Sequence, residues 1–73
     1  MYKNLSTINI NEVVTISSIS ESILKPKLIE MGLTQDRKLK VLFKAPFNGP
    51  IAIDLGDWVL SLGLDEAKLI NIK

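Results

Sequence analysis

The sequence predicts a mainly β domain: a small, strongly bent barrel of about five short strands, with one short α-helix after the first long strand. Apolar residues alternate with polar ones in several short segments, which is typical of half-buried strands, and they recur at spacings of three to four in one segment. Tight-turn residues separate these segments. Since about five short strands cannot make two useful packed sheets within 73 residues, a barrel is the economical way to bury their apolar faces and hide their edges.

The composition indicates one domain, residues 1–73, stabilised by apolar packing. The hydrophobic fraction of 47% is ordinary for a globular domain. The chain contains no cysteine and no histidine, so disulfides are excluded, as are the ligands that zinc, copper and iron–sulfur clusters prefer. A chain of this size buries only roughly 60% of the surface that its unfolded form exposes. The apolar faces of the strands must therefore carry its stability.

The first long strand is predicted at residues 12–19, which are rich in β-branched side chains. Val14 and Ile16 fall on the same face of this strand. An ordered lead-in that covers part of the core is expected before it, with the apolar residues Leu5, Ile8 and Ile10.

A helix is predicted next, because apolar residues recur with helical spacing. The stripe consists of Ile23, Leu24, Leu28, Ile29 and Met31. Gly32 is placed to end the helix, where glycine adopts a positive φ at little cost. Pro26 is tolerated only in the first turn of a helix, so the helix either covers residues 26–31 or starts near Ser22 with a flaw at the proline. We expect the longer, imperfect helix.

The second half of the chain predicts strands joined by short turns. The expected strands are residues 37–44, 51–55, 58–62 and 70–73, with a loop at 45–50, a tight turn at Gly56-Asp57 and a helical turn at 65–69. In the strand at 37–44, the alternation predicts that Leu39, Val41 and Phe43 face the core. It places Lys38, Lys40, Leu42 and Lys44 on the outer face.

The residue inventory excludes the common catalytic machinery. Without histidine and cysteine, the usual general base and the thiol nucleophile are missing. No pair of carboxylates stands out as a substitute, so we expect no enzyme activity and no cofactor. Residues 1–6 do not lead into a long apolar run, and no stretch of about 20 apolar residues could span a bilayer. We therefore expect a cytoplasmic protein.

Because the sequence lacks the common catalytic residues, binding to a partner is the function that we expect. Residues 25–44 are mainly basic and the residues after them mainly acidic, within a net charge of only +1. We predict a contact face that runs from the end of the helix, along the lysine-rich strand, to the loop after it. The candidate residues are Met31, Lys38, Lys40, Leu42, Pro46 and Phe47.

Two alternatives remain open. One is a site for a hard or transition-metal cation, formed by the carboxylates of Asp54, Asp57, Asp65 and Glu66. The other is nucleic-acid binding by basic residues interleaved with aromatic ones, namely Lys38, Lys40, Phe43, Lys44 and Phe47. The balanced charge and the expected burial of Phe43 speak against the second alternative, so we expect no nucleic-acid partner.

The order and spacing of several motifs resemble the FeoA family, the small ferrous iron transport protein A. The most specific motif is Glu30-Met31-Gly32-Leu33. The resemblance continues through the strand and proline-containing loop, the Gly49-Pro50 hairpin, and the ending in Asp65-Glu66-Ala67. Asn11 stands where this family usually has glycine, and asparagine tolerates left-handed backbone angles.

This resemblance implies an SH3-like barrel and a role in iron uptake. The family acts as a cytoplasmic accessory of FeoB, a membrane ferrous-iron transporter that carries a GTP-binding domain. The resemblance therefore implies that the partner is a FeoB-type transporter, contacted through its cytoplasmic GTP-binding domain. It also implies that the chain reaches the membrane only through this partner.

Overall fold

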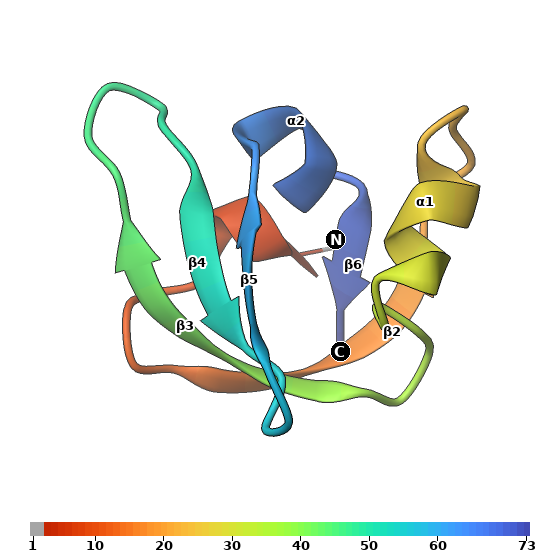
Figure 1. Ribbon diagram of the computed structural model, residues 1–73, viewed down its shortest axis with the longest axis horizontal. Helices are drawn as coiled ribbons and strands as arrows, with labels where there is room; N and C mark the ends of the chain where they lie inside the picture. The colour runs from red at the N-terminus through yellow and green to blue at the C-terminus, as the bar shows by residue number, and fades with distance from the viewer. Residues whose placement is uncertain (1–2) are drawn as a thin grey trace.

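The computed structural model describes residues 3–73; Met1 and Tyr2, which belong to the expected N-terminal segment, lie outside them. Figure 1 shows strands wrapped around one core, with the two helices at its rim. The strands are β1 (Lys3–Asn4), β2 (Val13–Ile19), β3 (Lys38–Lys44), β4 (Ile51–Asp54), β5 (Val59–Leu62) and β6 (Ile70–Ile72). The helices are a 3-10 turn, η1 (Leu5–Thr7), and two short α-helices, α1 (Lys25–Glu30) and α2 (Leu64–Ala67).

The strands form one bent antiparallel sheet in the order β1-β6-β2-β3-β4-β5. The barrel class is confirmed, and the sheet has one strand more than expected, because the two-residue β1 pairs with β6. β2 and β3 curve beneath the molecule, β4 and β5 rise on one side of it, and α1 lies on the other side (Figure 1). α2 lies between these two sides at the top.

The inward faces of the strands form a single apolar core. Val14 and Leu39 are partners across β2 and β3, and both are buried, as the alternation predicts. No polar or charged residue is buried among those that the structure describes. Leu5 and Ile8 of the lead-in pack into this core, whereas Ile10, which was expected to join them, is half exposed. The lead-in therefore covers the core with its first part only.

A β-bulge in β3 overturns the prediction for Phe43. The register between β3 and β4 shifts between Val41 and Phe43, so Leu42 is the extra residue. A bulge turns the side chains beyond it to the other face of the sheet. Leu39 and Val41 point into the core as predicted, but Phe43 is 56% exposed. Leu42, which was expected to point outward, is half-buried.

The expected helix from Ser22 is wrong, because α1 covers six residues only, Lys25–Glu30. Residues 22–24 form a turn instead, in which the Ser22 hydroxyl accepts a hydrogen bond from the Leu24 N–H at 3.1 Å. Pro26 lies in the first turn of α1, the position in a helix where its missing N–H costs nothing. Ile23 consequently lies outside the helical stripe and is almost fully exposed, while Leu28 is buried.

Two further features follow the sequence closely. Asn11 adopts a positive φ of 72°, as its tolerance of left-handed angles predicts. Gly56 in the turn has a φ of 97°, and the Asp54 carboxylate accepts a hydrogen bond from the Gly56 N–H at 2.7 Å.

Within residues 3–73, no helix has both the length and the apolar character needed to cross a membrane.

Candidate interaction surfaces

The six residues predicted to form one contact face do not lie on one surface. Met31 is half-buried at the end of α1 and packs against the core. Pro46 and Phe47 are exposed in the β3–β4 loop, on the side of the molecule away from α1 (Figure 1). Lys38 and Lys40 are exposed on the outer face of β3 between them. The structure thus divides the predicted face into separate surfaces.

The segment around Met31 has a structural role. Gly32 has a φ of 98°, and its N–H donates to the Ile29 carbonyl at 3.0 Å. The Leu33 N–H donates to the Leu28 carbonyl at 3.1 Å, and the Leu33 side chain is fully buried. This pair of bonds is a Schellman motif, which satisfies the last free carbonyls of the helix. The most family-specific motif of the sequence therefore ends α1 and returns the chain to the core.

Arg37 connects this helix end to the β4–β5 turn. Its Nη2 donates to the Leu55 carbonyl at 3.1 Å and to the Asp57 carboxylate at 2.5 Å. The position of a Cβ on Gly32 would lie 3.7 Å from the Trp58 indole nitrogen and 3.8 Å from Arg37 Nη1. The helix end, Arg37 and the turn thus pack together, and the charges of Arg37 and Asp57 are used within this cluster.

The outer face of the sheet carries apolar and charged side chains in alternation. Val13, Lys40, Asp54 and Val59 are successive partners across β2 to β5, so their side chains share one face. The bulge adds Phe43 to this face beside Lys40. Val13, Phe43 and Val59 are each more than half exposed. The face is mixed in character, because charged residues separate its apolar ones.

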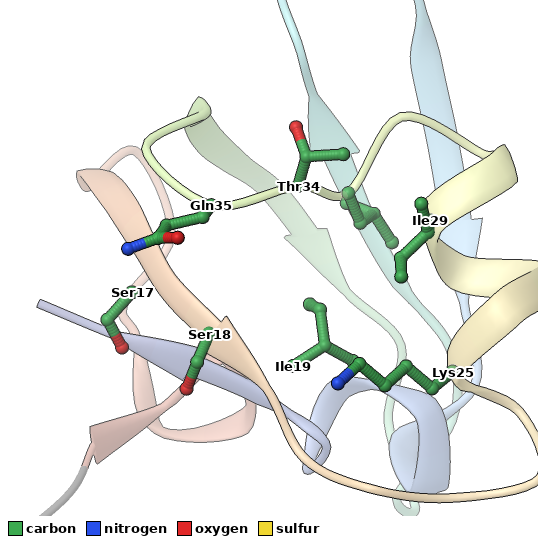
Figure 2. Close-up of a pocket in the computed structure, with 8 residues that line it drawn as sticks. Ser17, Ser18, Ile19, Lys25, Ile29, Thr34 and Gln35 are labelled. Carbon is green, nitrogen blue, oxygen red and sulfur yellow. The ribbon is translucent and has the colours of Figure 1, made fainter.

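A small groove separates α1 from β2 (Figure 2). It has a volume of about 240 Å³ and is lined by Ser17, Ser18, Ile19, Lys25, Ile29, Leu33, Thr34 and Gln35. Ile19 and Ile29 point into it from opposite sides, and Lys25 reaches across it from α1. The Lys25 ammonium already forms an ion pair with Glu21 at 2.5 Å. The groove suits an apolar side chain with polar groups at its edge.

A larger, open groove lies at the end of the barrel where α2 sits. We call it the barrel-end groove. It has a volume of about 490 Å³ and is lined by Leu24, Asn48, Gly63, Leu64, Asp65 and Glu66. These residues come from the turn before α1, the β3–β4 loop and the start of α2; the turn and the loop stand on either side of α2 at the top of the molecule (Figure 1). Ile23 and Phe47 are the chain neighbours of two lining residues, and they are 94% and 99% exposed.

The charge of the barrel-end groove is negative. The Glu66 carboxylate accepts a hydrogen bond from the Gly63 N–H at 2.9 Å, which caps α2, and it lies 3.3 Å from the Lys27 ammonium. Asp65 is exposed, and no ion pair among residues 3–73 involves it. The lining therefore carries two carboxylates, and only that of Glu66 is paired with a lysine among residues 3–73.

The carboxylates proposed as cation ligands do not converge. Asp54 bonds to its own turn, Asp57 pairs with Arg37, and Glu66 caps α2. Asp65 lies next to Glu66 at the barrel end, apart from the β4–β5 turn. Across residues 3–73, no three acidic side chains lie close enough together to hold a metal ion.

The structure removes one objection to nucleic-acid binding. Phe43 was expected in the core, but it is exposed beside Lys40 on the outer sheet face. Lys44, another residue of that alternative, donates to the Ser6 carbonyl at 3.2 Å and so is held by the chain itself. The balanced charge of the whole chain still gives no general attraction to phosphate groups.

The sequence reasoning missed Ile23, Val13 and Val59 as exposed apolar residues. One signal was available for Ile23: it lies three residues before Pro26, where a helix with proline in its first turn has not yet begun. For Phe43 there was no such signal, because regular alternation continues through the bulge in the sequence. Asp65 was considered as a metal ligand and not as part of a binding groove.

Comparison with known proteins matches both the sequence and the fold. A family model described as the FeoA domain matches residues 3–73. A FeoA-like protein from Clostridium acetobutylicum is 32% identical, with a TM-score of 0.90, over 99% of this chain and 85% of that one. An iron uptake regulatory protein, also described as FeoA, is 27% identical, with a TM-score of 0.86, over 100% of this chain and 96% of that one. A search of curated proteins by sequence found no match.

A more distant structure describes the same fold. FeoA from Stenotrophomonas maltophilia, solved in complex with zinc and described as a prokaryotic SH3 domain protein, has a TM-score of 0.86. It is 18% identical, over 97% of this chain and 89% of that one. The SH3-like barrel is thus shared at low identity, while the family model covers nearly the whole chain. On these grounds the chain belongs to the FeoA family, which is associated with ferrous iron transport.

Proposed function

We propose that this chain is a cytoplasmic, non-catalytic accessory of ferrous iron uptake that binds and modulates a FeoB-type membrane transporter by protein contact. The observation that carries the proposal is membership of the FeoA family over residues 3–73. The S. maltophilia relative is described as a candidate activating factor of bacterial ferrous iron transport. The GTP-binding domain of the transporter is the expected contact.

The surface chemistry supports protein binding over catalysis. The chain has no histidine or cysteine, and its acidic residues are dispersed or used in turns, caps and ion pairs. In contrast, several large apolar side chains are exposed, and two of them are almost entirely so. Exposed apolar residues gathered near a groove are typical of protein interaction sites. The zinc complex of the relative does not transfer readily, because this chain lacks the nitrogen and sulfur ligands that zinc prefers.

Measurement of ferrous iron uptake tests this proposal. Deletion of the chain from a cell that uses the transporter should lower uptake of radiolabelled Fe²⁺ if the chain activates transport, or raise it if the chain inhibits transport. Expression of the chain in trans should restore the original rate. An uptake rate that does not change on deletion would refute a modulating role.

The exposed pair Lys40 and Phe43 favours nucleic-acid binding as a second candidate. A cation beside an exposed aromatic ring is the minimal arrangement for contacting single-stranded nucleic acid. Fluorescence anisotropy with labelled single-stranded RNA at increasing salt distinguishes this candidate. Binding that weakens steeply with salt would support it, and an absence of binding at low salt would exclude it.

A further inference from the structure

The two most exposed apolar side chains of the described residues belong to residues that are each next in the chain to a lining residue of the same groove. Ile23 is 94% and Phe47 is 99% exposed. Their chain neighbours Leu24 and Asn48 line the barrel-end groove from opposite sides. In Figure 1, the turn before α1 and the β3–β4 loop rise on either side of α2 at this end of the molecule. Two segments that are distant in the sequence therefore border one groove, and each carries an exposed apolar side chain.

We propose that the barrel-end groove, together with the bordering residues Ile23 and Phe47, docks a segment of the partner that carries a basic side chain between apolar ones. This inference rests on the proposed function, since it names the face and the chemistry of that protein contact. Leu24 and Leu64 supply apolar lining, and Asp65 supplies a carboxylate without an ion-pair partner among residues 3–73. A lysine or arginine of the partner complements this charge.

The backbone of the β3–β4 loop holds Phe47 in its exposed position. Phe47 and Asn48 both have a positive φ, of 59° and 60°. A bulky residue rarely adopts this conformation. The loop is nevertheless tied at its base, because the Gly49 N–H donates to the Pro46 carbonyl at 3.2 Å and the Ala45 N–H to the Pro50 carbonyl at 2.9 Å. The phenyl ring is thus presented by an ordered turn, which lowers the entropy cost of binding.

The other exposed surfaces fit this role less well. On the outer sheet face, Lys40 and Asp54 interrupt the apolar residues, and neither of the two grooves described above is lined by residues of this face. In the smaller groove beside α1, the ammonium of Lys25 is already paired with Glu21. Of the two grooves described above, the barrel-end groove is the one that combines an apolar lining, a carboxylate without an ion-pair partner among residues 3–73, and bordering segments with almost fully exposed apolar side chains.

Affinity measurements with matched variants test the inference. The probe is the purified cytoplasmic GTP-binding portion of the FeoB-type transporter, titrated against the full chain by isothermal calorimetry. The double variant Ile23→Ser/Phe47→Ser should bind about tenfold more weakly or worse, as residues at the centre of an interface do. The matched control, Phe43→Ser/Val59→Ser, removes two exposed apolar side chains from the outer sheet face and should bind as the unaltered chain does.

Charge reversal provides the second arm of the test. Asp65→Lys should weaken binding and flatten its dependence on salt, whereas Glu30→Lys, an exposed carboxylate outside the groove, should leave both unchanged. If the unaltered chain binds and the groove variants bind equally well, the groove is wrong and the proposed function stands. If the unaltered chain does not bind in any nucleotide state, the proposed function fails, and the docking site fails with it.

Discussion

The Arg37 guanidinium donates a hydrogen bond to the Leu55 carbonyl oxygen at 3.1 Å, which ties the start of β3 to the β4–β5 turn. The same nitrogen contacts Asp57, whose side chain is 71% exposed. An exposed ion pair contributes little, whereas a charged donor to a carbonyl of the folded chain contributes more. The first contact therefore matters more for stability than the second.

Substitution of Arg37 tests this ranking. Arg37→Ala should lower the free energy of unfolding by about 1–2 kcal/mol, because the Leu55 carbonyl loses its donor. Asp57→Asn should change it by less than about 0.5 kcal/mol, since it alters only the exposed pair. Urea unfolding followed by circular dichroism measures both. Equal losses for the two variants would mean that the ion pair, and not the carbonyl contact, holds the turn.

Gly32 should be sensitive to any side chain. Its φ of 98° is unfavourable for an L residue, although the space around it would admit a Cβ in ordinary contact at 3.7 Å. We expect Gly32→Ala to cost about 1–2 kcal/mol, from the backbone alone. Gly63→Ala is the matched control, because Gly63 has an ordinary extended conformation with φ of −65°. Its loss of stability should stay below about 1 kcal/mol, because it comes only from the N-cap of α2, where alanine is less favourable than glycine.

The β-bulge predicts opposite outcomes at two positions of β3. Phe43→Ala should cost less than about 1 kcal/mol, because the ring is mostly exposed. Leu39→Ala should cost about 2–5 kcal/mol, because it leaves a cavity in the core. Thermal and urea unfolding of both variants distinguish the two. A loss at Phe43 as large as that at Leu39 would place Phe43 in the core and exclude the bulge.

β5 lies at the edge of the sheet, so proline should have different effects on stability at neighbouring positions of this strand. The Leu55 N–H donates to the Trp58 carbonyl at 2.9 Å, so Trp58 bonds toward β4. In an antiparallel pair every second residue bonds to the neighbouring strand, so Leu60 also bonds to β4, whereas Ser61 directs its N–H away from it. Ser61→Pro should therefore be tolerated far better than Leu60→Pro, which removes a bond of the ladder. Thermal unfolding should show a clearly lower midpoint for Leu60→Pro. Equal midpoints would mean that another strand covers this edge.

Much of the fold follows from local chemistry that the sequence displays. Alternation predicts the strands, and three of the positive φ angles fall on Asn11, Gly32 and Gly56, where the residue type makes this conformation least costly. The predicted helix was too long, because the apolar spacing that favours a start near Ser22 takes no account of the N–H that Pro26 lacks. The Ser22 side chain bonds to the backbone of the turn that precedes α1, which competes with an earlier start of the helix. Ile23 lies in this turn and is exposed.

The rest depends on contacts between distant segments. Leu42 becomes a bulge only through the register of β3 against β4, and regular alternation in the sequence conceals it. The barrel-end groove is lined by three segments that are separate in the sequence, so no single motif predicts it. Met31 and Phe47 were expected on one face because the helix end and the loop lie directly before and after the lysine-rich strand in the sequence. In the fold, the end of α1 and the β3–β4 loop lie on opposite sides of the molecule (Figure 1). Which of the candidate residues contact a partner stays a prediction, and their arrangement in the fold could not be read from the sequence.

A titration followed by nuclear magnetic resonance tests whether the chain binds the transporter through the barrel-end groove. ¹⁵N-labelled chain is titrated with the unlabelled cytoplasmic GTP-binding portion of a FeoB-type transporter, in the nucleotide-free, GDP and GTP-analogue states. We predict that amide signals of residues 22–24, 46–48 and 63–66 shift or broaden in at least one state, while those of the core strands stay in place. A spectrum that stays unchanged in excess partner in every nucleotide state would mean that the chain does not bind this part of the transporter.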